Sequence, residues 1–260
     1  MIRENEPTSS RPVRSHLARA GLFLALTGAS AVGLALFDVI PGGWRLRTLI
    51  VPQSVQDLRR REAHRQARLE QFASETKPAP GGTLFLGSST IERFPLAEHF
   101  GSLATVNRGI GDEDLSGLEA RALSTAMDLN PAQVVLYAGS VNVRRAIDDG
   151  SWTPPGEIVV RAGRLATGLL ELPGVEKVVL LGILPERETG AELADRLRET
   201  NAGLAAMAAF TDGIFFLPLA REPLIDAAGH LREEVSADRL HLNDAGYAIF
   251  AGWLQPLLEE

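Results

Sequence analysis

From residue 83 onward, short apolar runs alternate along the chain with longer stretches of helical periodicity. Several of the runs are continuous in Val, Ile, Leu and Phe, which is typical of strands buried on both faces of a parallel sheet. The runs lie at residues 83–86, 104–107, 133–137, 177–183 and 213–217. The helical patterns lie at residues 115–129, 157–172, 191–210 and 245–258. This repeated strand–helix alternation predicts a doubly wound α/β fold with a mainly five-stranded parallel sheet.

Residues 20–37 carry no charged side chain. A helix of that length, at about 1.5 Å per residue, roughly spans the hydrocarbon layer of a bilayer. We therefore expect an N-terminal membrane-anchor helix. Arginines precede the segment, which places the bulk of the chain outside the cytoplasm, periplasmic or extracellular. The sequence Ala29-Ser30-Ala31 leaves a cleaved signal segment open as an alternative, and a buried helix of a soluble protein is a third.

The remaining N-terminal residues lack the alternating pattern. Residues 54–72 predict a highly charged helix with Ser54 as its N-cap and a mostly solvated face. A turn-rich stretch at residues 77–82 follows, and it marks the expected domain boundary. The predicted organisation is a disordered tail at residues 1–19, an anchor or signal segment at residues 20–37, a linker with a charged helix at residues 38–82, and the α/β domain at residues 83–260.

Charge is divided unevenly along the chain. Residues 1–70 hold 11 basic and 6 acidic side chains, whereas residues 71–260 hold 15 basic and 27 acidic ones. An acidic main domain argues against a nucleic-acid partner, because phosphate binding needs a basic face. The chain has no Cys, and its His and Asp residues lack the spacing of metal ligands. We therefore predict neither a metal site nor a cofactor.

The most specific signal for chemistry lies at residues 238–247, ahead of the last predicted helix. Asp238 precedes His241 by three residues in a polar turn, so the carboxylate can reach one imidazole nitrogen and leave the other as a base. A base of this kind needs a nucleophile, and Ser89 follows the first apolar run directly. Because ligands bind at the carboxyl ends of the strands in open α/β sheets, Ser89 is the candidate nucleophile.

Ester chemistry also needs hydrogen-bond donors directed at the oxygen that becomes negative. Two loops that follow predicted strands could supply them, at residues 107–112 and 138–142.

In these residues the chain resembles the SGNH or GDSL-type hydrolases. Gly87-Ser88-Ser89-Thr90-Ile91 resembles the Gly-Ser-Ser-Ser-Ile variant of the first block of that family, and residues 107–112 and 139–142 resemble its second and third blocks. Residues 238–247 closely resemble its Asp-x-x-His-x-Asn-x-x-Gly-Tyr ending. The blocks come in the order of the family, over roughly residues 83–258. The resemblance implies a flavodoxin-like three-layer α/β/α sandwich and ester or acyl hydrolysis at a shallow, open site.

The oxyanion hole departs from the family pattern in two places. The oxyanion glycine of the second block aligns with Asp112, which leaves Gly111 one position early. In the third block, aligned without a gap, the Asn of the family falls on Val141, and Asn142 can replace it only if the loop is shifted by one residue. We take Gly111 and Asn142 as the candidate oxyanion residues.

Together these features predict a membrane-anchored or exported serine esterase with Ser89, His241 and Asp238 as its catalytic residues. The expected substrate is a small O-acyl ester on a sugar, a glycan or a lipid. Two alternatives stay open: acyl transfer to an alcohol by the same fold, and a catalytically weak or inactive descendant that binds carbohydrate or a partner. The oligomeric state is not indicated by the sequence.

Overall fold

The structure is a computed structural model that describes residues 52–148 and 153–259. The chain divides into two compact units, residues 1–62 and 63–260. Helix α3 (Gln53–Ser74) begins in the first unit and ends in the second. All other elements of the described residues belong to the second unit.

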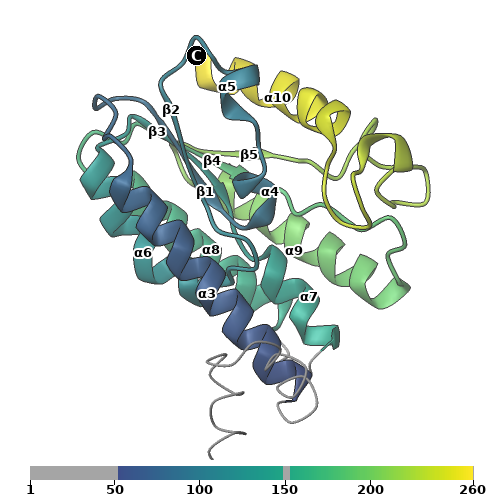
Figure 1. Ribbon diagram of the computed structural model, residues 1–260. Coiled ribbons are helices and arrows are strands. Elements are labelled where there is room, and N and C mark those ends of the chain that lie inside the picture. Colours follow the sequence, from purple (N-terminus) through teal and green to yellow (C-terminus); the bar gives the residue numbers. More distant parts are fainter. Residues whose placement is uncertain (1–51, 149–152, 260) are drawn as a thin grey trace, which may run out of the picture. The chain divides into compact units, whose positions relative to one another are not determined.

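Five parallel strands form one sheet in this unit (Figure 1). They are β1 (Thr83–Gly87), β2 (Thr105–Gly109), β3 (Gln133–Tyr137), β4 (Lys177–Leu181) and β5 (Ile214–Leu217). Their spatial order is β2-β1-β3-β4-β5, which is the order of flavodoxin-like doubly wound sheets. Each predicted strand is confirmed to within two residues at either end.

Helices cover both faces of the sheet and complete the predicted three layers (Figure 1). One face carries α6 (Leu115–Leu129), α8 (Pro155–Leu170) and α9 (Ala191–Ala209). The other carries the short helices α4 (Ser89–Glu92) and α5 (Leu96–His99) and the C-terminal helix α10 (Asp244–Glu259). The four helices predicted for this domain are therefore confirmed, with shifts of one or two residues at their ends.

Burial explains why the strands appear in the sequence as continuous apolar runs. All five residues of β1 are buried, since β1 lies between β2 and β3 and beneath helices on both faces. The edge strand β5 lacks that cover on one side, and Phe215 is 41% exposed there. Only the central strands of a parallel sheet need to be apolar on both faces. Of the two edge strands, β2 follows this rule, with Thr105, Asn107 and Arg108, whereas β5 is apolar at every position.

An aromatic cluster joins α10 to the segment that follows β1. The ring of Phe94 stacks on Phe250 with 4.6 Å between centroids and on Tyr247 with 5.0 Å. Phe85 of β1 meets the edge of the same ring at 5.9 Å. This packing fixes α10, and the turn that precedes it, against the segment that contains Ser89.

Three features near the ends of elements depart from the predictions. Helix α3 begins at Gln53, so Ser54 lies inside the first turn and the predicted N-cap is wrong. Helix α7 (Ser140–Asp148) and a 3-10 turn at Glu233–Val235 were not expected. Both are short, and neither has an apolar periodicity long enough to distinguish it from a loop.

The predicted anchor at residues 20–37 lies outside the described residues. Within residues 52–148 and 153–259, no helix is long and apolar enough to cross a membrane.

Candidate active site

Ser89 is the first residue of α4, directly beyond the carboxyl end of β1. The chain turns sharply there, and Gly87 allows the turn: a Cβ at this position would lie 2.7 Å from the carbonyl oxygen of Tyr137 and 2.8 Å from the side chain of Ile91. Ser88 takes an extended conformation as the N-cap. The Ser89 side chain is thereby held beside the first N–H groups of α4, which have no intrahelical carbonyl to bond.

His241 reaches Ser89 from the turn that precedes α10. Its Nε2 lies 2.9 Å from the Ser89 hydroxyl oxygen. Its Nδ1 lies 2.8 Å from one carboxylate oxygen of Asp238 and 3.0 Å from the other. The structure therefore brings Ser89, His241 and Asp238 into one continuous hydrogen-bonded chain, although Ser89 and His241 are 152 positions apart.

The Asp238 carboxylate also organises the backbone of its own turn. One carboxylate oxygen accepts the N–H groups of Leu240 and His241, each at 2.8 Å. Partial burial raises the pKa of Asp238, but these backbone bonds and the His241 ring outweigh it and hold the pKa well below its usual range. Asp238 is therefore a carboxylate throughout the neutral and mildly acidic range.

The rest of the last motif fixes this turn to α10 and α4. The side chain of Asn243 accepts the Gly246 N–H at 3.0 Å and acts as the N-cap of α10. A Cβ at Gly246 would collide with the carbonyl oxygen of Val235. The Tyr247 hydroxyl donates to the carbonyl of Thr90 at 2.9 Å, and burial raises the pKa of Tyr247, so this donor stays protonated. The spacing of the motif thus connects His241 to the residue that follows Ser89.

Gly111, a predicted oxyanion residue, lies in the loop between β2 and α6. Its N–H donates to a carboxylate oxygen of Glu92 and is not available to another acceptor while that bond is in place. The next residue, Asp112, has φ +63°, a left-handed conformation that favours glycine but is accessible to Asp. The backbone at Asp112 therefore has the conformation expected of the glycine that the family places there.

Asn142, the other predicted oxyanion residue, lies in the first turn of α7 and is buried. Its side-chain oxygen accepts the Leu115 N–H at 2.8 Å, at the start of α6. Within the described residues, no hydrogen bond involves its amide nitrogen. Val141 is half-buried beside it and has no donor to offer. The roles of Gly111 and Asn142 as oxyanion donors stay predictions.

Two acidic residues outside the predicted set of site residues contact the surroundings of this site. Glu92 contacts Gly111, as described above. Glu186 is buried and binds Arg239, the residue after Asp238, through its second oxygen, with the Arg239 Nε 2.7 Å away. Its first oxygen accepts from Arg144 of α7 at 3.2 Å. Neither contact follows a regular spacing, because each pairs residues that only the fold brings together.

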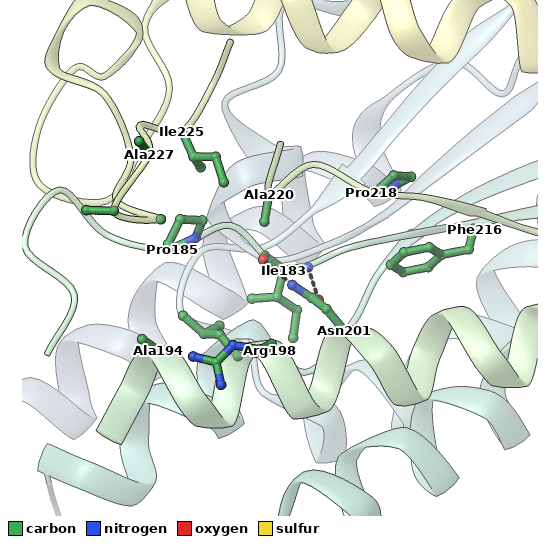
Figure 2. Close-up of a pocket in the computed structure, with 13 residues that line it drawn as sticks. Ile183, Pro185, Ala194, Arg198, Asn201, Phe216, Pro218, Ala220, Ile225 and Ala227 are labelled. Atoms are coloured by element: carbon green, nitrogen blue, oxygen red, sulfur yellow. Dashed lines mark hydrogen bonds between the residues drawn. The ribbon is translucent and has the colours of Figure 1, made fainter. Parts of the chain in front are cut away.

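Within the described residues, no group of three or more His, Cys, Asp or Glu side chains could hold a metal ion. A cavity of about 370 Å³ opens beyond β4 and β5 and is lined mainly by apolar side chains, among them Ile183, Phe216 and Ile225 (Figure 2). None of Ser89, His241 and Asp238 lines it. The hydrogen-bonded chain at Ser89 is therefore not part of this cavity: Asp238 is exposed, and Ser89 and His241 are half-buried.

Chemically, the arrangement can activate a hydroxyl group. An imidazole that faces a carboxylate on one side can accept the proton of a hydroxyl on the other, which converts a weak nucleophile into a strong one. The same imidazole can then return the proton to a leaving group.

The sequence model of the GDSL-like Lipase/Acylhydrolase family matches residues 91–249, more than half of the chain. The chain belongs to this family. The match makes it a carboxylic ester hydrolase and confirms the resemblance seen in its motifs. The matched range begins two residues after Ser89, so the assignment of Ser89 as the nucleophile rests on the geometry above. No curated protein matches the chain.

Solved structures of such enzymes share the fold. A GDSL-like lipase from Bacteroides thetaiotaomicron has a TM-score of 0.64 at 20% identity, and the match covers 75% of this chain and 96% of that one. An acetylxylan esterase from Geobacillus stearothermophilus has a TM-score of 0.55 at 18% identity, over 71% of this chain and 97% of that one. At such identities the similarity establishes the architecture alone.

Proposed function

We propose that this chain is a serine esterase that hydrolyses small O-acyl esters carried by a sugar, a glycan or a lipid, with Ser89, His241 and Asp238 as its catalytic triad. The observation that carries the proposal is the unbroken chain of contacts from the Ser89 hydroxyl through both nitrogens of His241 to Asp238, at 2.9 and 2.8 Å.

In the proposed reaction, the Ser89 oxygen attacks the ester carbonyl while His241 accepts the hydroxyl proton. Asp238 keeps the proton of the imidazole on Nδ1 and stabilises the imidazolium. His241 then gives its Nε2 proton to the alcohol oxygen, which leaves. Water attacks the acyl-enzyme with His241 again as the base, and the acid is released with Ser89 restored.

The tetrahedral intermediates carry an oxyanion, which needs donors. The Ser89 N–H at the start of α4 is one candidate, and the Asn142 side-chain amide is another. From the loop after β2, the Asp112 N–H is a better candidate than that of Gly111, since Gly111 donates to Glu92. The Arg145 side chain donates to the Asp112 carbonyl at 3.2 Å and pairs with Asp114 at 2.8 Å, so a cation offsets the acidic residues of this loop.

The preference for a small acyl group has two supports. The triad lies away from the apolar cavity beyond β4 and β5, so this cavity does not adjoin Ser89 as a site for a long acyl chain. One of the structures with the same architecture is an esterase of acetylated xylan.

The test is a panel of p-nitrophenyl esters of increasing acyl length, together with acetylated xylo-oligosaccharides, on the full chain in detergent. We expect the highest kcat/KM for acetate and a decrease with longer chains. An alcohol acceptor added to the same assay distinguishes transfer from hydrolysis by the appearance of a new ester. Absence of turnover on every ester, with no labelling by a fluorophosphonate, would contradict the proposal and leave the binding-protein alternative.

Asn142→Asp tests the proposed side-chain donor. The aspartate retains the oxygen that accepts the Leu115 N–H but removes the amide donor, so the fold should persist while kcat decreases about 10²–10³-fold, the usual cost of one oxyanion donor. The measurement is kcat with a short ester, and Val141→Asn is the comparison variant. If Val141 occupied the position of the family's Asn, Val141→Asn would raise kcat and Asn142→Asp would change it little.

We also propose that residues 20–37 hold the protein in the membrane, with the catalytic domain outside the cytoplasm. The length of the uncharged segment and the arginines before it support this. Protease added to spheroplasts should digest the domain and leave a cytosolic marker intact. Full protection of the domain, or its recovery with soluble cytosolic proteins, would refute this location.

A further inference from the structure

Glu92 links the helical turn of Ser89 to the loop after β2. It lies three residues after Ser89 in α4, and its carboxylate accepts the Gly111 N–H. Gly111 is packed closely against two side chains: a Cβ at this position would lie 3.0 Å from the same carboxylate oxygen of Glu92 and 3.3 Å from the imidazole of His64. The carboxylate therefore fits against the backbone of this loop, one residue before the left-handed Asp112.

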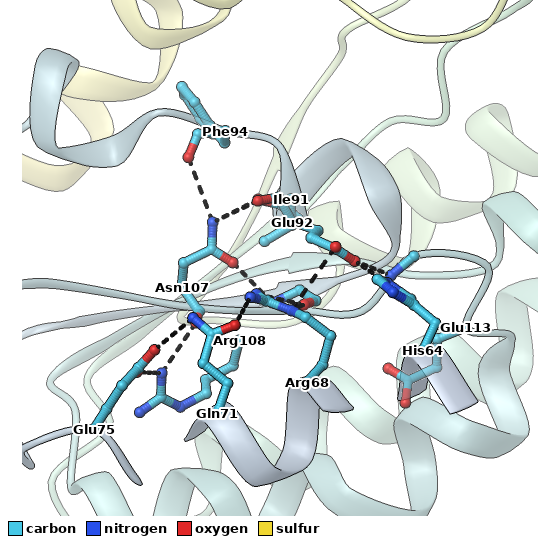
Figure 3. A network of polar contacts seen from close by, with 12 residues as sticks. His64, Arg68, Gln71, Glu75, Ile91, Glu92, Phe94, Asn107, Arg108 and Glu113 are labelled. Atoms are coloured by element: carbon cyan, nitrogen blue, oxygen red, sulfur yellow. Dashed lines mark hydrogen bonds and ion pairs between the residues drawn. The ribbon is translucent and has the colours of Figure 1, made fainter. Parts of the chain in front are cut away.

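Helix α3 holds this carboxylate from the opposite side (Figure 3). The His64 Nε2 lies 3.0 Å from the oxygen that accepts the Gly111 N–H. The Arg68 Nε lies 3.9 Å from the other oxygen. Arg68 also donates to the carbonyl of Gly109, the last residue of β2, from Nε at 3.2 Å and from Nη2 at 3.0 Å. Two cationic or potentially cationic side chains thus balance the charge of Glu92.

Arg68 is not a freely moving surface side chain. Its guanidinium stacks on the ring of Phe72 at 4.7 Å, and the guanidinium of Arg108 lies 4.6 Å from the same ring. Arg108 is buried and bonds to Glu75 at 2.5 Å. Residues 63–74 of α3 therefore contact the edge strand β2 through Arg68, while no residue of the helix is buried, in agreement with the mostly solvated helix that the sequence predicts.

We propose that Glu92 is a positioning residue for the site at Ser89, and that His64 and Arg68 of α3 hold it in place. This inference rests on the proposed esterase function. By joining α4 to residues 109–112, Glu92 sets where the backbone N–H groups of that loop lie relative to the Ser89 hydroxyl. A donor displaced by about 1 Å from a developing oxyanion costs on the order of 10²-fold in rate, whereas the bound substrate is affected less.

The test compares Glu92→Ala, Glu92→Gln and His64→Ala in the full chain, with kcat and KM for a short ester as readouts. Glu92→Ala should lower kcat by roughly 10- to 100-fold with little change in KM, since the misplacement affects the transition state. Glu92→Gln should recover most of the rate, because the amide oxygen still accepts the Gly111 N–H. His64→Ala should lower kcat by a smaller factor, and adding it to Glu92→Ala should cost little more.

Gln66→Ala is the matched control. Gln66 lies on the same helix, and its side chain bonds to Glu70 one turn along at 3.2 Å. This variant should retain the kcat of the wild type. A Glu92→Ala enzyme whose kcat stays within twofold of the wild type would overturn the inference, as would a change in KM alone or a failure of Glu92→Gln to recover the rate. If Glu92→Ala does not fold, His64→Ala takes its place, because half-exposed His64 can be truncated without opening the core. An unchanged kcat in His64→Ala, or a change in KM alone, would then overturn the inference.

A second readout does not depend on catalysis. The Gly111 amide proton, followed by NMR in the full chain, should resonate far downfield in the wild type and in Gln66→Ala, as expected for a bond to a carboxylate. It should move upfield in Glu92→Ala and respond to His64→Ala. If the wild type hydrolyses no ester, the proposed function fails, and this signal still decides whether Glu92 holds the loop. An unchanged Gly111 signal in Glu92→Ala overturns the inference whatever the activity.

Discussion

Ser89→Ala is expected to abolish covalent labelling by a fluorophosphonate and to reduce ester hydrolysis on the order of 10⁶-fold, as loss of the nucleophile does in serine hydrolases. The substitution removes only the hydroxyl group. His241, whose Nε2 lies 2.9 Å from the Ser89 hydroxyl oxygen, would then have no hydroxyl proton to accept. The fold should persist, because the Ser89 side chain is half-buried and makes no core contact that Ala cannot make. Labelling is measured by gel fluorescence, and folding by circular dichroism.

The neighbouring hydroxyl provides the control. Ser88 is buried and bonds to the hydroxyl of Ser140 at 2.9 Å, with no contact to His241. Ser88→Ala should lose one neutral hydrogen bond, about 1 kcal/mol of stability, and still be labelled. Labelling that persists in Ser89→Ala, or that disappears only in Ser88→Ala, would show that Ser89 is not the nucleophile.

The sheet and the contacts among Ser89, His241 and Asp238 were predictable because their signals are local. A central strand such as β1 must be apolar on both faces, so it appears in the sequence as a continuous apolar run. The turn at Asp238 and His241 needs a spacing of three residues to bring a carboxylate to an imidazole. Gly246 and Tyr247, at the start of α10, are required for close packing and for the bond to Thr90. Each of these demands fixes a residue type at a set distance along the chain.

The contacts that surround the triad could not be predicted in this way. Glu92 and Gly111 are 19 positions apart, and His64 is 28 positions from Glu92, so no periodicity relates them. A charged helix such as α3 has the same pattern whether its arginines face water or a backbone carbonyl. The sequence also favoured Gly111 over Asp112 as the oxyanion residue by residue type. In the structure, Asp112 has a left-handed φ, the conformation that glycine favours.

Asp238→Asn should leave the fold intact and lower kcat on the order of 10⁴-fold, the loss given by the corresponding change in trypsin. The Asn oxygen can still accept the N–H groups of Leu240 and His241, so the turn should be retained. The Asn amide would instead donate to Nδ1 of His241. The imidazole proton would then lie on Nε2, facing Ser89, and the ring could not accept the hydroxyl proton.

The loss of kcat in Asp238→Asn should be the same from neutral through mildly acidic pH. Hydrogen bonds hold the pKa of Asp238 well below its usual range, so the wild type retains the carboxylate from neutral pH through mildly acidic pH, and the ratio of wild-type to variant kcat should stay large across that range. Arg93→Ala is the control, because Arg93 is half-exposed and lies 3.4 Å from the same carboxylate. An exposed ion pair contributes about 0–1 kcal/mol, so this variant should lose less than about fivefold. If Asp238→Asn also lost less than about tenfold, Asp238 would serve the turn and not the chemistry, and the base at Ser89 would have to be oriented by another group.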